Sequence, residues 1–182
     1  MTTIVGLQGN GWAVMAADSQ ITEDNLRIIS SETPKIIKFK DILIGIRGDA
    51  RPGDIIAYNW KPPRVGKDIT KWVVGVMVPS MIKTFDKYGY DWKDEKSDFN
   101  FLVAVKGQLF DIGADMSISR SDMGMYASGS GKEYALGALL CLGSTDDIAT
   151  AESRVSAAVD IASTFDINTS HPIQVERSYG KA

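Results

Sequence analysis

Two short, mostly apolar runs at the start of the chain predict two β-strands joined by a tight turn. Residues 3–8 and 12–17 are rich in apolar side chains, and a Gly-Asn-Gly turn at 9–11 separates them. Asn and Gly tolerate positive φ, so Asn-Gly between apolar runs is a strong short-range signal for a hairpin. We therefore expect the two strands to lie side by side, which brings Asp18 close to the start of the chain.

The later patterns fall into separate runs of strands and helices. Segments rich in β-branched or aromatic residues predict strands at 26–29, 35–39, 42–46, 99–105, 108–112, 123–127 and 173–175. Helices are predicted at 54–60, 68–88, 132–142 and 148–165, with an interruption at Pro79 and a cap at 145–147. Residues 19–33 are otherwise expected to form a loop. This order is typical of an α+β fold in which two antiparallel sheets pack face to face, each covered outside by a helix pair.

Composition narrows the class of protein. The chain has 182 residues, 44% of them hydrophobic and 24% charged, which predicts a single globular domain over 1–182. A net charge of −3 gives no basic footprint for nucleic acid. No signal peptide is recognised, and no apolar run approaches the roughly 18 residues of a membrane span, so we expect a cytoplasmic protein with no membrane partner.

The counts of cysteine and histidine restrict the possible chemistry. Cys141 is the single cysteine, which excludes an internal disulfide and fits a reducing compartment. It lies in an apolar run and is expected to be a small buried side chain. His171 is the single histidine, so a His-rich metal site is excluded and a Ser-His-Asp triad would have to use it.

The first residues suggest a different kind of catalytic unit. If Met1 is removed, Thr2 becomes the chain terminus and carries a hydroxyl and a free amine on one residue. A terminal amine can act as the base that activates a weak hydroxyl nucleophile. Its ordinary pKa of about 7.7–8.0 leaves much of it neutral near neutral pH. Taken alone, a Met-Thr start carries no functional meaning, and an Asp after a strand is usually a turn or cap residue.

An ordered set of short motifs resembles a known family. The opening Thr-Thr-Ile-Val at 2–5, Ala-Ala-Asp at 16–18, Gly-Ser-Gly at 129–131 with Tyr-Ala at 134–135, and the segment 166–171 are similar to HslV and the proteasome β-subunits. The match is good at both ends of the chain and poor between about 50 and 98. The resemblance implies a four-layer αββα N-terminal nucleophile hydrolase and a threonine peptidase that cleaves peptides or unfolded proteins.

The resemblance also implies roles for particular residues. Thr2 would be the nucleophile, and Lys35 the buried ammonium that lowers the pKa of the threonine hydroxyl or amine, with Asp18 as its partner. Lys38 is a nearby competitor for that role. The backbone N–H of Gly48 would face the developing oxyanion.

Further roles follow from the same resemblance. Ser130 matches a serine that bonds the threonine amine, and Asp166 an acid that orients that serine. Ile46 falls where the family lines its substrate pocket, which would favour apolar substrates. Ser163, Asp166 and Thr169 have the spacing at which family members offer backbone carbonyls to a monovalent or divalent structural cation. No other cofactor is expected.

The sequence also leads to expectations about the partners of the chain and leaves two alternative functions open. The resemblance implies homo-oligomeric rings stacked face to face and an ATP-driven unfoldase that feeds them. The segment 50–98 departs from the family, which leaves ring size and docking open. One alternative is an inactive ring or assembly protein with the same fold, which would follow if Met1 is retained, because an amide nitrogen is not a base. Another is an amidohydrolase of the same fold that acts on a small amide.

Overall fold

Two antiparallel sheets form the centre of the molecule. The structure is a computed structural model, and it describes residues 2–23, 26–29 and 32–180. Within those residues the first sheet has the order β10 (Met125–Gly129), β1 (Thr3–Gly9), β2 (Trp12–Ala17), β11 (Gln174–Tyr179). The second has the order β5 (Ile36–Phe39), β6 (Ile42–Gly48), β7 (Phe99–Val105), β8 (Gln108–Ile112), β9 (Ile118–Ser119).

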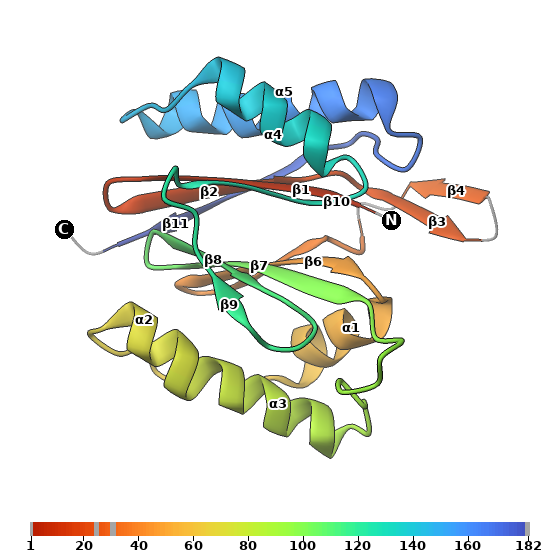
Figure 1. The fold of residues 1–182 in the computed structure, drawn as a ribbon, viewed down its shortest axis with the longest axis vertical. Coiled ribbons are helices and arrows are strands. Elements are labelled where there is room, and N and C mark those ends of the chain that lie inside the picture. The colour runs from red at the N-terminus through yellow and green to blue at the C-terminus, as the bar shows by residue number, and fades with distance from the viewer. Residues whose placement is uncertain (1, 24–25, 30–31, 181–182) are drawn as a thin grey trace.

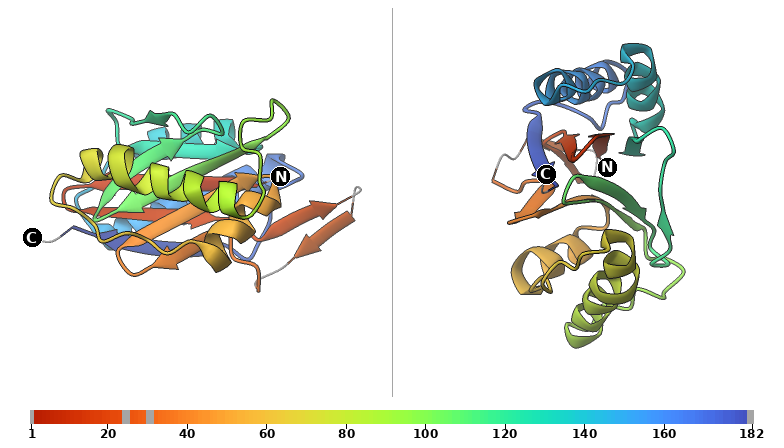
Figure 2. Two further views of the ribbon diagram at one scale, coloured as in Figure 1. Left: turned by 90° about the horizontal axis from the view of Figure 1, so that it is seen from below. Right: turned by 90° about the vertical axis from the view of Figure 1, so that its left-hand side faces the viewer.

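Helices cover the outer face of each sheet (Figure 1). Helices α4 (Lys132–Leu142) and α5 (Ile148–Phe165) pack on the first sheet. On the other side, α1 (Ala50–Asn59) and the continuous helical segment α2 (Ile69–Trp72), η1 (Val73–Met77) and α3 (Val78–Lys87) lie over the second sheet. The right-hand view of Figure 2 shows the two helix groups at opposite ends with the sheets between them. The chain thus has a mixed fold of antiparallel sheets and helices.

The hydrophobic core follows this arrangement. One buried cluster joins α1, α2, η1 and α3 to the second sheet, and Phe85, Phe99 and Phe101 lie in it. A second joins α4 and α5 to the outer face of the first sheet. A third lies between the sheets, where Ile4 and Leu102 are buried. Strand residues therefore alternate between two apolar environments, which explains why β1, β2 and β7 are apolar at almost every position.

Most of the elements expected from the sequence are present. The hairpin β1–β2, the strands β7 and β8, and helices α4 and α5 begin and end within a residue of their expected bounds. Asp147 caps α5, because its side chain accepts the Thr150 N–H at 2.7 Å. At Pro79, which has no N–H to donate, the helix changes type: the wider π-helical segment η1 comes just before α3.

Other expectations were wrong in detail. Residues 20–23 form a strand, β3 (Gln20–Glu23), where a loop was expected, and it pairs with β4 (Leu26–Ile29) in a hairpin that extends beyond the rest of the molecule (Figures 1 and 2). Helix α1 begins four residues before its expected start at 54, and β11 extends four residues past its expected end at 175. Strand β9 was not anticipated, because two residues give no periodic signal.

Cys141 is exposed, which corrects the expectation that it is buried. The buried positions of α4 are Ala135 and Leu139, four residues apart on one face. Cys141 lies two residues after Leu139, about 200° around the helix, and so faces outward. The apolar composition of the run was misleading because α4 carries apolar residues on its outer face as well. No helix in the described part of the chain combines the length and apolarity needed to cross a membrane.

Candidate active site

Thr2 lies just before β1, beside the end of the neighbouring antiparallel strand β10. Thr2 is buried, and its carbonyl accepts the backbone N–H of Ser130 at 2.8 Å. This approach depends on Gly129, whose φ is +98°. A Cβ at that position would lie 1.8 Å from the Thr2 carbonyl oxygen, so only glycine allows the two segments to come this close. The expected juxtaposition of Thr2 and Ser130 is therefore present.

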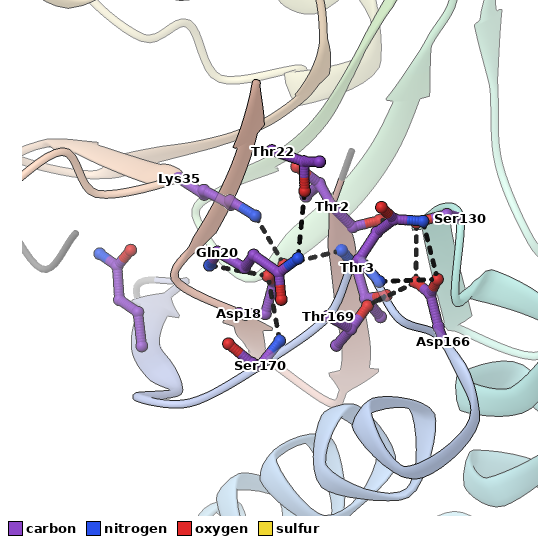
Figure 3. Close-up of polar contacts among 12 residues, drawn as sticks. Thr2, Thr3, Asp18, Gln20, Thr22, Lys35, Ser130, Asp166, Thr169 and Ser170 are labelled. Carbon is purple, nitrogen blue, oxygen red and sulfur yellow. Dashed lines mark hydrogen bonds and ion pairs between the residues drawn. The ribbon is translucent and has the colours of Figure 1, made fainter. Parts of the chain in front are cut away.

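Asp18 joins three parts of the site (Figure 3). Because β1 and β2 are antiparallel, with Ile4 opposite Ala17, Asp18 leaves β2 beside Thr3. Its Oδ1 accepts the Thr3 backbone N–H and the Lys35 ammonium, both at 2.8 Å. Its Oδ2 accepts the backbone N–H of Gln20 at 2.9 Å. One buried carboxylate thus orients the first residues of the chain and the lysine together.

Lys35 is the lysine that pairs with Asp18. Its side chain is 10% exposed and that of Asp18 is 0% exposed. Burial lowers the pKa of the Lys35 ammonium from its usual 10.5, and the neighbouring Asp18 carboxylate acts in the opposite direction. Lys38, the competitor suggested by the sequence, points elsewhere and pairs with Glu176 at 2.8 Å. The alternation of β5 separates the two lysines: three residues apart, they face opposite sides of the strand.

Hydrogen bonds from hydroxyl groups connect the Asp166 carboxylate to Ser130 and, through Thr169, to Thr3. Asp166 Oδ2 accepts the hydroxyl of Ser130 at 2.7 Å and that of Thr169 at 2.6 Å. Thr169 Oγ1 also lies 2.6 Å from Thr3 Oγ1. Burial raises the pKa of the Asp166 carboxyl, but the hydrogen bonds from Thr169, Ser130 and Asn168 outweigh it and hold that pKa below its usual value. The carboxylate is therefore the form that this network favours.

Gly48 and Ile46 line the same cavity as Thr2. The cavity has a volume of about 300 Å³ and is bounded by β3, β5, β6, α1 and the segment 32–35. Gly48 ends β6 with φ +88°, and a Cβ there would lie 2.0 Å from the carbonyl oxygen of Asp98. The turn into α1 thus requires glycine at this position. Whether the Gly48 N–H binds an oxyanion, and whether Ile46 selects apolar substrates, stay predictions.

The possible cation site is untested. Ser163 lies in the last turn of α5, and Asp166 and Thr169 lie in the segment that follows. The Asp166 carbonyl accepts the Thr169 N–H at 3.0 Å, so one of the three carbonyls already has a backbone partner. Within the described residues, no group of three or more His, Cys, Asp or Glu side chains is arranged to hold a metal.

The chain is similar to known proteases over nearly its whole length. No protein-family model matches the chain. The ATP-dependent protease subunit HslV of Pediococcus pentosaceus is 22% identical over 94% of this chain and 91% of its own length. HslV of Ligilactobacillus salivarius is 24% identical over 97% of this chain and 98% of its own length. These similarities fit an assignment of the chain to the HslV and proteasome β-subunit family.

Solved structures of other proteins share the fold. BPH of Thiobacillus denitrificans superposes with a TM-score of 0.79 at 21% identity, over 99% of both chains. Eukaryotic HslV of Trypanosoma brucei gives 0.71 at 20% identity, over 98% of this chain and 99% of its own. The BPH protein has also been solved in complex with epoxomicin. HslV relatives are proteases, so a peptidase is the enzyme class that the comparisons support for this chain.

Thr3 and Gln20 were not predicted from the sequence as residues of the site, and Thr169 was expected only as a carbonyl ligand of a cation. Thr3 contributes its hydroxyl as well as its N–H, and Thr169 contributes a hydroxyl that links Thr3 to Asp166. Gln20 donates from its side chain to the Ile167 carbonyl at 2.9 Å and to Thr22 at 3.1 Å. Thr3 and Thr169 are 166 residues apart, and no local pattern indicates that they meet. The one available signal was their proximity in sequence to Thr2 and Asp166.

Proposed function

We propose that the chain is a threonine peptidase of an HslV-like or proteasome-like protease, with Thr2 as the nucleophile after Met1 is removed. The whole chain, 1–182, would form one N-terminal nucleophile hydrolase domain with four layers in the order αββα. The observation that carries the proposal is the placement of Thr2. Its carbonyl is held by Ser130, its neighbour Thr3 is held by Asp18, and the same Asp18 oxygen binds Lys35.

In the proposed reaction, Thr2 Oγ attacks the carbonyl carbon of a peptide bond while the free Thr2 amine takes the hydroxyl proton. Lys35 favours this step, because a nearby positive charge lowers the pKa of the hydroxyl and of the ammonium. The Gly48 N–H stabilises the negative oxygen of the tetrahedral intermediate. The proton then passes to the leaving amine, and an ester between Thr2 and the acyl group remains.

Hydrolysis of the ester by water completes the proposed reaction. The Thr2 amine, again neutral, takes a proton from an attacking water molecule, and the ester collapses to release a carboxylic acid and restore the hydroxyl. Ser130 and Asp166 would serve as positioning residues. Asp166 accepts the Ser130 hydroxyl, and the Ser130 backbone fixes the carbonyl of Thr2. The terminal amine is thereby directed toward its own hydroxyl.

Self-assembly into stacked rings is part of the proposal, and an exposed apolar surface supports it. The outer face of α4 and the end of α5 carry large apolar side chains, which we call the α4–α5 surface: Tyr134, Leu136, Leu140, Leu142, Ile161, Phe165 and Ile167, each at least 38% exposed. Large exposed apolar side chains that gather in one patch mark interaction sites in soluble proteins. The named HslV relatives are ATP-dependent, so an ATP-driven unfoldase is the proposed partner that supplies unfolded substrates.

Peptides and unfolded proteins are the proposed substrates, and the cytoplasm is the proposed location. No cofactor takes part in the mechanism above. We also propose a structural cation held by the carbonyls of Ser163, Asp166 and Thr169. Elemental analysis of the purified, unmodified protein tests this, and bound metal is the expected result.

Hydrolysis of a fluorogenic peptide by the processed protein tests the function. Thr2→Ala should abolish cleavage, because it removes the hydroxyl and keeps a small residue after Met1. Thr2→Ser should retain part of it, since serine also offers a hydroxyl beside the terminal amine. Cleavage by Thr2→Ala at the wild-type rate would contradict the role of Thr2. Cleavage of small amides without any cleavage of peptides would favour the amidohydrolase.

A further inference from the structure

The cavity beside Thr2 combines apolar walls with carboxylates at its opening. Its strand side presents Ile21, Ile37 and Ile46. Glu32 and Asp54 also line it, and both are exposed. This combination suits a side chain with an apolar stem and a charged end, since Lys and Arg bury their methylene stems while the head group stays in contact with water.

Helix α1 leaves room for such a side chain. Ala50, Gly53 and Ala57 lie on the helical face that lines the cavity, at spacings of three and four. All three are small, and Gly53 packs against Ile46, where an added Cβ would lie 3.1 Å from its Cδ1. Asp54 lies one residue further round the same face. Its carboxylate therefore borders a space that the neighbouring side chains of α1 do not fill.

The charges around the cavity favour a cation. Lys35 is the lysine that lines the cavity, and its ammonium is paired with the Asp18 carboxylate at 2.8 Å. Asp49 also lines the cavity and accepts the backbone N–H of Asp98 at 3.2 Å. No described residue forms a hydrogen bond or ion pair with the side chain of Glu32 or Asp54 in this structure, so their charges are available to a ligand.

Gln20 also lines the cavity, and the oxygen of its side-chain amide is buried. Its Nε2 donates to the Ile167 carbonyl, which can only accept, so the orientation of the amide is fixed. Its Oε1 is buried and has no hydrogen-bond partner among the described residues. A buried acceptor without a partner is unfavourable, so this part of the wall carries an unmet polar group beside the apolar side chains.

We infer that this cavity binds a basic side chain, arginine or lysine, of the residue whose carbonyl Thr2 attacks. The inference rests on the proposed function and names its substrate class. The isoleucine walls contact the methylene stem, and Glu32 and Asp54 pair with the ammonium or guanidinium. Ile46 keeps the contact with apolar atoms that the sequence suggested, but the end of the substrate side chain is positive.

Peptide substrates that differ in a single residue test this specificity. A set of acetylated tripeptide fluorogenic amides carries Arg, Lys, norleucine or Glu as the residue before the scissile bond. Norleucine has the stem of lysine without its charge. We expect kcat/KM for Arg and Lys to exceed that for norleucine by about tenfold, the order expected for one hydrogen bond to a charged group. Glu should be the poorest substrate.

Charge-removing variants identify the carboxylates. Asp54→Asn and Glu32→Gln should each reduce the ratio of Arg to norleucine cleavage several-fold, and added salt should reduce it in the wild type. Asp86→Asn is the matched control, because Asp86 is an exposed acid of α3 outside the cavity, and the ratio should stay as in the wild type. A norleucine rate equal to or above that for Arg, unaffected by Asp54→Asn, would overturn the inference.

Binding separates this inference from the proposed function. Thr2→Ala protein is titrated with fluorescent peptide amides ending in Arg or norleucine, and anisotropy gives their affinities without any cleavage. Tighter binding of the Arg peptide, lost in Thr2→Ala/Asp54→Asn, supports the inference even if the wild type cleaves nothing, a result that would refute the peptidase alone. Equal binding of the two peptides refutes the inference even if the wild type is an active peptidase.

Discussion

The Oδ1 atom of Asp18 accepts the backbone N–H of Thr3 at 2.8 Å, and the same atom accepts the Lys35 ammonium at 2.8 Å. A carboxylate whose side chain is fully buried thus fixes the start of the chain relative to a positive charge. In the proposed mechanism that geometry matters twice, since it orients the nucleophile and it places the charge that lowers the pKa of the hydroxyl.

Replacing Asp18 with Asn should destabilise the fold strongly. The change removes the carboxylate that pairs with the buried Lys35 ammonium, and breaking a buried pair in this way costs about 3 kcal/mol or more. Denaturant unfolding of wild type and Asp18→Asn measures the difference in the free energy of unfolding. Asp86→Asn, an exposed control, should change it by less than about 0.5 kcal/mol.

A double-mutant cycle refines that prediction. Lys35→Met removes the charge and keeps the apolar stem, so Asp18→Asn should cost less in the Lys35→Met background than in the wild type. Equal costs in both backgrounds would mean that Asp18 acts through the backbone N–H groups of Thr3 and Gln20 and not through Lys35.

Asp166 should contribute to stability in a pH-dependent way. Its folded pKa lies below the usual 3.8, so the contribution is fully present above that value and is lost as the pH falls through the folded pKa. Asp166→Asn should lower the free energy of unfolding by about 2 kcal/mol near neutral pH, because Ser130 and Thr169 lose a charged acceptor. The difference between the two proteins should shrink below pH 3.8. A difference that does not change with pH would contradict the assigned direction.

Gly48→Ala should reduce both stability and activity. Its φ of +88° disfavours any side chain, and the added Cβ would lie 2.0 Å from the Asp98 carbonyl oxygen. We expect a loss of about 2 kcal/mol or more in the free energy of unfolding, together with a loss of peptide cleavage. Gly137→Ala is the matched control, since nothing lies within 4 Å of its added Cβ in α4, and it should be neutral or slightly stabilising.

The α4–α5 surface should determine the oligomeric state. Leu140→Glu places a charge on that surface, where Leu140 is 58% exposed in the isolated chain. If copies of the chain meet there, burying an unpaired carboxylate is costly, and sedimentation velocity should show smaller particles than for the wild type. Lys83→Glu on α3 serves as a control at the opposite helix group. Particles of the same size for Leu140→Glu would mean that assembly does not use this surface.

The parts of the fold that could be predicted have strong local signals. The Asn-Gly turn identified the β1–β2 hairpin, and the apolar spacing from Ala151 to Ala162 identified α5. Strand β3 has a weak signal because its first residue, Gln20, is polar and buried, and its position depends on contacts with Asp18 and Ile167. The exposure of Cys141 depends on which face of α4 meets the sheet, which composition does not decide.

Some contacts of the candidate site could also be predicted from the sequence, and others could not. Asp18 could be placed near Thr2 from the hairpin alone, because antiparallel pairing fixes which residues lie opposite each other. The Thr3–Thr169–Asp166 hydroxyl network could not, since its members meet only when the segment after α5 folds back onto β1. Gly131 belongs to the same contact: a Cβ there would lie 2.3 Å from Thr3 Oγ1.

Intact mass spectrometry of the purified protein, before and after treatment with epoxomicin, tests the central claim most directly. The account predicts a chain lighter than the encoded sequence by one methionine residue, and a mass increase of one inhibitor molecule that is absent in Thr2→Ala. A chain that keeps Met1 and gains no mass from the inhibitor would contradict it, because the Thr2 nitrogen would then be an amide and could not act as the base.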